Sequence, residues 1–470
     1  MRLLRRATKI LAVIVLCGVA GVGLLLSGLW IDHHQETELL APTGQLAVGR
    51  TTFDWRDPRQ QELMAPHAGI PREIFAWVWY PASAQSRSQP ADYFPSSWRD
   101  AFNRQRGWFL TEFLWRDLSR VHAHSAESPR LSDAEKEYPV IVMRAGLAVD
   151  TAEYTSLAED LASHGYVVVG FDAPYRSTVV VFPDGRVVAR TPQDNADLLS
   201  GNAQKQLATR LMQAWTSDMG FALDHMEKLN ANDPSGRFTG RLDLSKVGVF
   251  GHSLGGATAL QFCHEDMRCK AGADIDGAPL GSAVTDGVKQ PFLFLLSDHS
   301  SEPKTQTAPV LADMRAIYDR LPKDKRLWIV LRGSEHFGFM DLTPLPLQFA
   351  HALGIVRMSS RRQIEITRDC LRTFFGVYLK GAPPSTLRLL RKYPQVEYSR
   401  EGSAGDASGP WSSFVPPRGI TGQSSSRTDT IEWPCVRLIP LEKELPFLGG
   451  WHLLWQWSLH RALHKSPTRH

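Results

Sequence analysis

The stretch "VGVFGHSLGGATAL" (Val247–Leu260) joins a short β-branched run to a helix-forming run through a glycine-rich turn. Ser253 lies in that turn, within the pattern Gly-x-Ser-x-Gly that runs from Gly251 to Gly255. The pattern is short and chance matches are common, but a strand before it and a helix after it place the serine on a strained turn with its hydroxyl exposed. The context therefore predicts that Ser253 is a nucleophile, and the alternative is a purely structural turn.

A serine hydroxyl needs a base to accept its proton and a carboxylate to orient that base. Both partners are expected after the nucleophile, with the acid first and the histidine last. His336 lies in the loop after the strand-like run at 326–331 and is the predicted base. His299 and His351 are the alternatives, whereas His252 lies inside the turn and is expected to point elsewhere.

Position along the chain leaves two candidates for the acid. Asp276 ends the strand-like run after the predicted nucleophile helix, and Asp298 lies just past the next one. Asp274 should share a strand face with Asp276 but lie deeper in the sheet. Position alone therefore does not choose between Asp276 and Asp298.

Two backbone N–H groups must also face the oxyanion that forms on a substrate carbonyl. The residue after the nucleophile, Leu254, supplies one, and Leu147 in the loop after residues 138–143 is the predicted second donor. A reaction of this kind needs neither a metal nor a cofactor, and none is expected.

Strands and helices alternate from Thr51 onward, which is typical of an α/β fold with a mostly parallel sheet and helices on both faces. Residues 83–137 are expected to be irregular and to pack around the mouth of a site. The predicted strands cover residues 74–82, 138–143, 166–172, 246–250, 271–276, 291–296 and 326–331, and the predicted helices cover 154–165, 207–229, a run from 257, and 368–380.

The N-terminus carries four basic residues up to Lys9, and no charge follows from Ile10 to Ile31. Such a run is long enough to cross a bilayer, and a basic start with an apolar stretch also fits a secretory signal. A retained anchor is favoured because the apolar run continues past the possible cleavage site at 18–20. Either interpretation exports the rest of the chain, which is then anchored in the inner membrane facing the periplasm or extracytoplasmic side, or secreted.

Composition divides the chain into five segments. Residues 1–31 form the anchor or signal, 32–48 a linker, 49–400 the catalytic domain, 401–432 a Gly-, Ser- and Pro-rich linker, and 433–470 a Trp-rich tail. The tail could lie at a membrane surface or pack on the domain. The formal net charge of +4 gives no reason to expect a nucleic-acid partner.

Export makes a disulfide plausible. Cys263 falls late in the predicted nucleophile helix and Cys269 falls just before the next strand. A bridge between them would join helix to strand, and the alternative is two unpaired thiols that act as small apolar residues.

From Pro42 to Val396 the chain resembles the platelet-activating-factor acetylhydrolase family of α/β-hydrolases, in its bacterial branch. The resemblance is carried by "PREIFAWVWYPA", "GLAVDTAEYTSLAEDLASHGYVVVGFD", "LNANDPSGRFTGRLDLSKVGVFGHSLGGATAL", "KAGADIDGAPLG" and "GSEHFGFMD". It implies an α/β-hydrolase fold and a serine ester hydrolase acting on short acyl groups, such as the acetyl esters of phospholipids.

The resemblance also assigns roles to residues. It implies Ser253 as nucleophile and His336 as base, with oxyanion donors at Leu147 and Leu254. The family takes its acid from the strand after the nucleophile helix, so Asp276 in "DIDG" is favoured over Asp298.

The chain departs from the family at the oxyanion loop, where Arg144-Ala145-Gly146 stands in place of the common Ser-His-Gly. That change alters the expected wall of the pocket and leaves the ester open. A general carboxylesterase, a lipase or a polyester hydrolase is the alternative within the same chemistry. A hydrolase-fold protein that binds a partner without catalysis is the alternative from another class.

Overall fold

The computed structural model describes residues 2–84, 88–190, 201–343 and 356–398, together with Leu345, Gln348, His351 and Gly354. The expected linker 401–432 and tail 433–470 lie outside the described residues.

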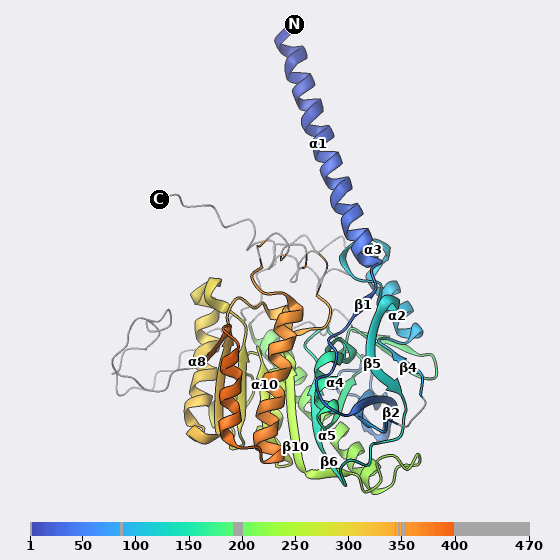
Figure 1. The fold of residues 1–470 in the computed structure, drawn as a ribbon, viewed down its shortest axis with the longest axis vertical. Helices are drawn as coiled ribbons and strands as arrows, with labels where there is room; N and C mark the ends of the chain where they lie inside the picture. Colours follow the sequence, from blue (N-terminus) through green and yellow to red (C-terminus); the bar gives the residue numbers. More distant parts are fainter. Residues whose placement is uncertain are drawn as a thin grey trace, which may run out of the picture.

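Figure 1 shows the arrangement of the strands and helices. The strands are β1 (Thr37–Glu38), β2 (Ala47–Gln61), β3 (Pro71–Ala82), β4 (Pro90–Asp92), β5 (Val121–Glu127), β6 (Tyr138–Arg144), β7 (Val167–Asp172), β8 (Val179–Val181), β9 (Val187–Ala189), β10 (Leu242–His252), β11 (Cys269–Ile275), β12 (Phe292–Leu296), β13 (Arg326–Leu331) and β14 (Val396–Tyr398). The α-helices are α1 (Arg2–His33), α2 (Ser96–Arg106), α3 (Trp108–Leu114), α4 (Thr155–Ser163), α5 (Gly201–Ala231), α6 (Leu254–Glu265), α7 (Ala283–Asp286), α8 (Lys304–Arg320) and α10 (Ser360–Lys380). Short 3-10 helices are η1 (Leu118–Arg120), η2 (Thr151–Tyr154), η5 (His299–Ser301), η6 (Lys323–Lys325), η7 (His336–Phe339) and η8 (Pro384–Lys392).

One sheet organises the described chain. Its order is β1-β5-β2-β3-β7-β6-β10-β11-β12-β13-β14, and β4 pairs with β5 beside this path. The run from β7 to β13 is parallel, whereas β3 pairs antiparallel with both β2 and β7, and β14 pairs antiparallel with β13. The predicted α/β class with a mostly parallel sheet is confirmed.

Successive side chains of the central strands enter two separate cores. In β6, Val140 and Val142 pack in the core that includes residues of α5, α6 and α8, whereas Ile141 and Met143 pack in the core that includes residues of α2, α4 and α10. This two-residue period follows from the pleat of a strand. Helices cover both faces, as a buried parallel sheet requires.

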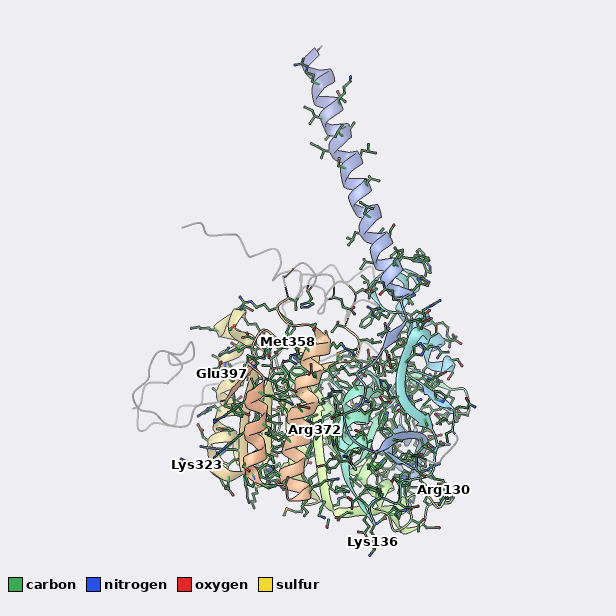
Figure 2. All side chains as sticks on the ribbon, in the orientation of Figure 1. Arg130, Lys136, Lys323, Met358, Arg372 and Glu397 are labelled. Atoms are coloured by element: carbon green, nitrogen blue, oxygen red, sulfur yellow. A yellow bond between two sulfur atoms is a disulfide. The ribbon has the colours of Figure 1, made fainter. Side chains whose placement is uncertain are left out.

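The carboxyl ends of the parallel strands lie at the edge of the sheet that faces α1. Lys136 precedes β6 and Lys323 precedes β13, and both lie at the end of the molecule opposite α1 (Figure 2). Met358, just before α10, lies nearer to α1. Loops that leave this carboxyl edge, including the one after β10, therefore face the side from which α1 projects (Figure 1).

Some elements differ from the sequence predictions. Residues 83–137 contain β4, α2, α3 and β5 rather than irregular chain, and the long strand β2 was not expected because charged residues interrupt its apolar pattern. Helix α8 contains Pro309 in its interior, which argues against a helix at the sequence level. Helix α10 begins at Ser360, eight residues before the predicted start, and ends as expected at Gly381 in the left-handed conformation.

Helix α1 contains the segment Thr8–His33, the one stretch of the described chain that is long and apolar enough to cross a membrane. A signal sequence near an N-terminus has the same properties. The end of this helix is tied to the domain, because Arg116 Nη2 donates to Asp32 Oδ1 over 2.9 Å and to Gln348 Oε1 over 2.9 Å.

The segment 32–48, expected as a linker, packs on the domain. Its strand β1 pairs with β5, and Leu39 is buried. The backbone N–H and the hydroxyl of Thr43 both donate to Asp160 Oδ1, over 2.9 and 2.7 Å. These bonds attach the segment to helix α4.

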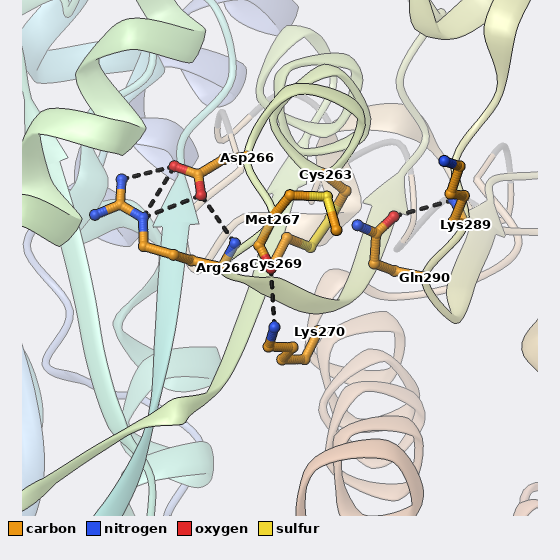
Figure 3. The surroundings of a disulfide bond; sticks show 8 residues. All are labelled: Cys263, Asp266, Met267, Arg268, Cys269, Lys270, Lys289 and Gln290. Atoms are coloured by element: carbon orange, nitrogen blue, oxygen red, sulfur yellow. Dashed lines mark hydrogen bonds and ion pairs between the residues drawn. A yellow bond between two sulfur atoms is a disulfide. The ribbon is translucent and has the colours of Figure 1, made fainter.

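A disulfide joins Cys263 of α6 to Cys269 at the start of β11, so of the two alternatives that the sequence leaves open the structure has the bridge (Figure 3). The connecting turn is also held by Arg268, which pairs with Asp266 over 2.6 Å and with Asp224 of α5 over 2.7 Å. Helix α6 and strand β11 are thereby linked at the end of the sheet opposite the Ser253 turn.

Candidate active site

The turn between β10 and α6 holds Ser253 in a strained conformation, with φ 57° and ψ −126°. The close packing around it explains the glycines. A Cβ on Gly251 would lie 2.2 Å from the carbonyl carbon of Gly255, and one on Gly255 would lie 2.3 Å from the carbonyl oxygen of Arg144. A side chain at Gly251 would collide with the first turn of α6, and one at Gly255 would collide with the end of β6, so the sequence pattern is a packing requirement of the turn.

Ser253 and His336 meet at the carboxyl edge of the sheet. His336 opens η7 after β13, and its Nε2 lies 3.1 Å from Ser253 Oγ. Its Nδ1 lies 2.7 Å from Asp276 Oδ2. Since a carboxylate only accepts, Nδ1 carries the proton, which leaves Nε2 free to accept the proton of the serine.

Asp276 follows β11, and its carboxylate accepts hydrogen bonds from several neighbouring groups. Its side chain is 1% exposed, and Ser297 donates to it twice, from the backbone N–H to Oδ1 over 2.9 Å and from the hydroxyl to Oδ2 over 2.6 Å. Burial alone would raise the pKa of Asp276, but its contacts with His299 and His336 hold that pKa well below its ordinary value. The carboxyl group is therefore charged at neutral pH.

The alternative acids lie elsewhere. Asp298 accepts from the N–H of Gly333 over 2.7 Å and faces Arg332 Nη1 at 3.3 Å, so it caps the loop after β13. Asp274 is fully buried and accepts from the N–H of Gly277 over 2.8 Å. The structure thus brings Asp276, and neither of these two, to His336.

The alternative histidines also have other partners. His351 Nδ1 donates to the carbonyl oxygen of Val356 over 2.9 Å. His299 does reach the site, but its Nε2 lies 2.8 Å from Asp276 Oδ1 rather than beside Ser253. The contact between His299 and Asp276 was not predicted from the sequence.

His252 connects three parts of the site. Its Nδ1 lies 2.7 Å from the hydroxyl of Tyr154, and its Nε2 lies 3.0 Å from the carbonyl oxygen of His336. Burial, with the nearby His336, lowers the pKa of His252 to about 3, so the ring is neutral. The Tyr154 hydroxyl also accepts from the N–H of Gly146 over 3.3 Å. Sequence reasoning missed the contacts of Tyr154 and Ser297. The one signal for Ser297 is that it directly follows β12, the strand that pairs with β11 and so lies beside Asp276.

The two predicted oxyanion donors lie around Ser253. Leu254 is the first residue of α6, where a backbone N–H has no partner within the helix. The loop with Leu147 passes close to the nucleophile, since a Cβ on Gly146 would lie 3.4 Å from Ser253 Cβ. The side chains of Leu147 and Leu254 pack on one apolar cluster, here called the leucine wall, whose buried members are Met64, Leu211, Ala214 and Trp215.

Arg144, the departure at the oxyanion loop, supports this wall. Its side chain is buried, and the guanidinium carbon lies 3.9 Å from the ring centroid of Trp215. Its Nη1 donates to the carbonyl oxygen of Phe171 over 3.2 Å. Burial lowers the pKa of Arg144 to about 10, so it remains a cation and holds Trp215 by a cation–π contact.

One group among the described residues could offer three ligand atoms to a metal ion. His33, His34 and Glu112 place such atoms within 4.8 Å of one another where α1 meets α3. The group shares no residue with the Ser253 site.

Comparisons with known proteins agree with this geometry. The family model described as platelet-activating factor acetylhydrolase, isoform II matches residues 31–358. A platelet-activating factor acetylhydrolase from Cavia porcellus is 27% identical over 342 residues, covering 67% of this chain and 74% of the relative. Cutinase 2 from Thermobifida cellulosilytica is 27% identical over 201 residues, covering 43% of this chain and 61% of the relative. The structure of a ferulic acid esterase from Streptomyces cinnamoneus superposes with a TM-score of 0.62 at 24% identity, covering 78% of this chain and all of that one.

The sheet order, the strained serine turn and these relatives define an ester hydrolase with the α/β-hydrolase fold. Since the family model covers most of the chain, this protein belongs to the family of platelet-activating factor acetylhydrolase, isoform II.

Proposed function

We propose that this chain hydrolyses short-acyl esters of lipids, acetyl esters above all, through an acyl-enzyme on Ser253. The observation that carries the proposal is the continuous set of contacts from Ser253 Oγ to His336 Nε2, at 3.1 Å, and from His336 Nδ1 to Asp276, at 2.7 Å. A buried, charged acid and a base with a free nitrogen are what a serine needs to act as a nucleophile.

In the first step His336 takes the proton of Ser253, whose oxygen attacks the ester carbonyl. The N–H groups of Leu147 and Leu254 stabilise the oxyanion. The alcohol then leaves with the proton from His336. Water attacks the acyl-enzyme in the second step, with His336 again acting first as base and then as acid, while Asp276 orients the ring and stabilises its charged form.

A short acyl group is supported by the leucine wall beside the nucleophile. Leu147 and Leu254 meet Trp215 there, and the Trp215 ring is held in place by Arg144. We expect this large, fixed indole, packed on the side chains of the two oxyanion-donor residues, to restrict the length of the acyl chain that can enter.

A lipid substrate is supported by the orientation of the site. The carboxyl edge that carries Ser253 faces the side from which α1 projects, and Arg116 links the end of α1 to Gln348 in the chain that follows η7 (Figure 1). With α1 in a bilayer as a retained anchor, the site would open toward the lipid surface. The basic residues in the first turns of α1 favour an extracytoplasmic domain, and the disulfide between Cys263 and Cys269 fits an oxidising compartment.

The experiment compares the full chain and Ser253→Ala, in detergent, on an acetylated phospholipid, a long-chain phospholipid, a triglyceride and a polyester. We expect the acetylated phospholipid to react fastest, and Ser253→Ala to fall to the background rate with unchanged thermal unfolding. Trp215→Ala should raise the rate on the longer acyl chain relative to acetyl. Hydrolysis retained by Ser253→Ala would overturn the mechanism. A polyester preferred by the wild type would favour the second candidate, a polyester hydrolase, which the similarity to cutinase 2 supports.

A further inference from the structure

Asp276 contacts a second histidine besides His336. His336 occupies Oδ2 at 2.7 Å, while His299 Nε2 approaches Oδ1 at 2.8 Å. Ser297 also donates to this carboxylate, through its backbone N–H to Oδ1 and through its hydroxyl to Oδ2. Because an ionised carboxylate has no proton to give, His299 Nε2 carries one.

The other nitrogen of His299 meets a second carboxylate. His299 Nδ1 lies 2.6 Å from Glu302 Oε1, within the first turns after β12. This nitrogen therefore carries a proton too, and an imidazole protonated on both nitrogens is a cation. Burial alone would lower the pKa of His299, but Asp276 and Glu302 raise it well above its ordinary value.

The titratable groups around His299 come from three parts of the chain. Asp276 follows β11 and contacts His299 through Oδ1, and Glu302 follows η5. His336 is the first residue of η7 and contacts the other oxygen of Asp276, Oδ2. The adjacent Asp298 faces Arg332 from the loop after β13 and caps the backbone of that loop. The positive charge on His299 is thus held by two carboxylates, one of which is the acid of the proposed reaction.

We infer that His299, fixed by Glu302, is a positioning residue that orients Asp276 toward His336 and offsets part of its negative charge. This inference rests on the proposed function. The His299 cation on Oδ1 of Asp276 makes it less favourable for His336, on Oδ2, to take up a second proton in the free enzyme. The reason is that like charges repel across the shared carboxylate. Loss of this cation should therefore show in the pH dependence of the reaction.

The test is the pH dependence of kcat/KM for hydrolysis of p-nitrophenyl acetate by the full chain. His299→Gln keeps an N–H donor and removes the charge, so the acid-side midpoint of the profile should move upward by about one pH unit. Glu302→Gln removes the anion that keeps His299 protonated, so a smaller upward movement is expected. Each variant should keep the maximal kcat within about tenfold of the wild type.

A matched control exists on β5, where His122 pairs with Glu36 at 2.7 Å on the surface. His122→Gln removes the same type of pair away from Asp276 and should leave the midpoint unchanged. A midpoint that stays in place in both His299→Gln and Glu302→Gln would overturn the inference. Glu302→Gln alone decides it if His299→Gln does not fold. Ser253→Ala separates the two proposals. Hydrolysis retained by Ser253→Ala refutes the proposed function. If Ser253→Ala is inactive and the midpoint does not move in His299→Gln and Glu302→Gln, only the role of His299 is refuted.

Discussion

His252 Nε2 donates to the backbone carbonyl oxygen of His336 over 3.0 Å, so the residue before the proposed nucleophile holds the backbone of the proposed base. The hydroxyl of Tyr154 faces the other ring nitrogen of His252 at 2.7 Å. Because this hydroxyl also accepts from Gly146, one chain of hydrogen bonds connects the oxyanion loop, the serine turn and η7.

Replacing His252 by alanine should therefore lower kcat about tenfold with little change in KM, because the base loses its support while the substrate pocket stays in place. The pH profile should keep its shape, since His252 is neutral throughout the working range. Tyr154→Phe removes only the hydroxyl and should have a smaller effect in the same direction. An unchanged kcat in His252→Ala would show that the contact with His336 has no role in the reaction.

Gly255→Ala should destabilise the fold by about 2 kcal/mol or more, because the new Cβ would lie 2.3 Å from a backbone oxygen that has no room to move. Thermal unfolding measures this loss. Gly376→Ala is the matched control, because its Cβ would lie in open space inside α10, with Ala382 as nearest neighbour at 4.0 Å. That control should be neutral or slightly stabilising. Equal unfolding temperatures for the two variants would contradict the packing of the turn.

The free energy of unfolding of the double variant Cys263→Ala/Cys269→Ala should be about 2 kcal/mol lower than that of the wild type, as expected for the loss of a disulfide that closes a short loop. Its kcat should change little, because the bridge lies at the ends of α6 and β11 away from Ser253 and Asp276. A reducing agent should lower the unfolding temperature of the wild type and leave the double variant unaffected. The buried free thiol Cys370 provides the control, since Cys370→Ala should keep the response to reductant. Insensitivity of the wild type would mean that no bridge forms.

Asp274 gives the protein a pH-dependent stability. Burial, together with the charge of Asp276, raises the pKa of Asp274 well above its ordinary value, although the N–H of Gly277 works against this. The unfolded carboxyl group loses its proton near pH ~4, while the folded one keeps it. The contribution of Asp274 to stability is therefore complete below pH ~4 and falls as the pH rises toward its folded pKa.

Asp274→Asn should consequently match the wild type in unfolding temperature near pH 4.5 and exceed it by several degrees near pH 8. Asp298→Asn should behave in the opposite way. The pKa of Asp298 is lowered, because its hydrogen bonds with Ser300 and Gly333 outweigh its partial burial, so its contribution is present above pH ~4 and lost in acid. A wild type that is more stable than Asp274→Asn at pH 8 would contradict a protonated Asp274.

The central strands and helices could be predicted from sequence because each carries a strong local signal. Strand β6 is an uninterrupted apolar run, and the apolar spacing within α5 follows one helical face. Helix α8 and strand β2 could not be predicted in this way. Pro309 in α8 argues against a helix at the sequence level. The charged residues of β2 interrupt its apolar pattern, and the strand is stabilised by pairing along its length with β3.

The candidate site divides in the same manner. Ser253 has a local signature, and His336 follows the last long strand, so the sequence alone predicts both as site residues. Asp276 and Asp298 stand at the ends of neighbouring strands, and position along the chain does not indicate which carboxylate turns toward the histidine; only the resemblance to the family favours Asp276. The difference lies in the backbone: Asp276 has φ 55° and faces His336, whereas Asp298 caps η5. The second histidine on Asp276 depends on the same tertiary arrangement.

The most direct test of the account is reaction of the folded, full-length chain with a fluorophosphonate, followed by peptide mass spectrometry and an assay of the remaining ester hydrolysis. Only a serine activated by a neighbouring base reacts quickly with such a reagent. The account predicts one adduct on the peptide that contains Ser253, formed in parallel with the loss of activity and absent from the unfolded chain. Loss of activity with an adduct on another serine, while Ser253 stays unmodified, would contradict it.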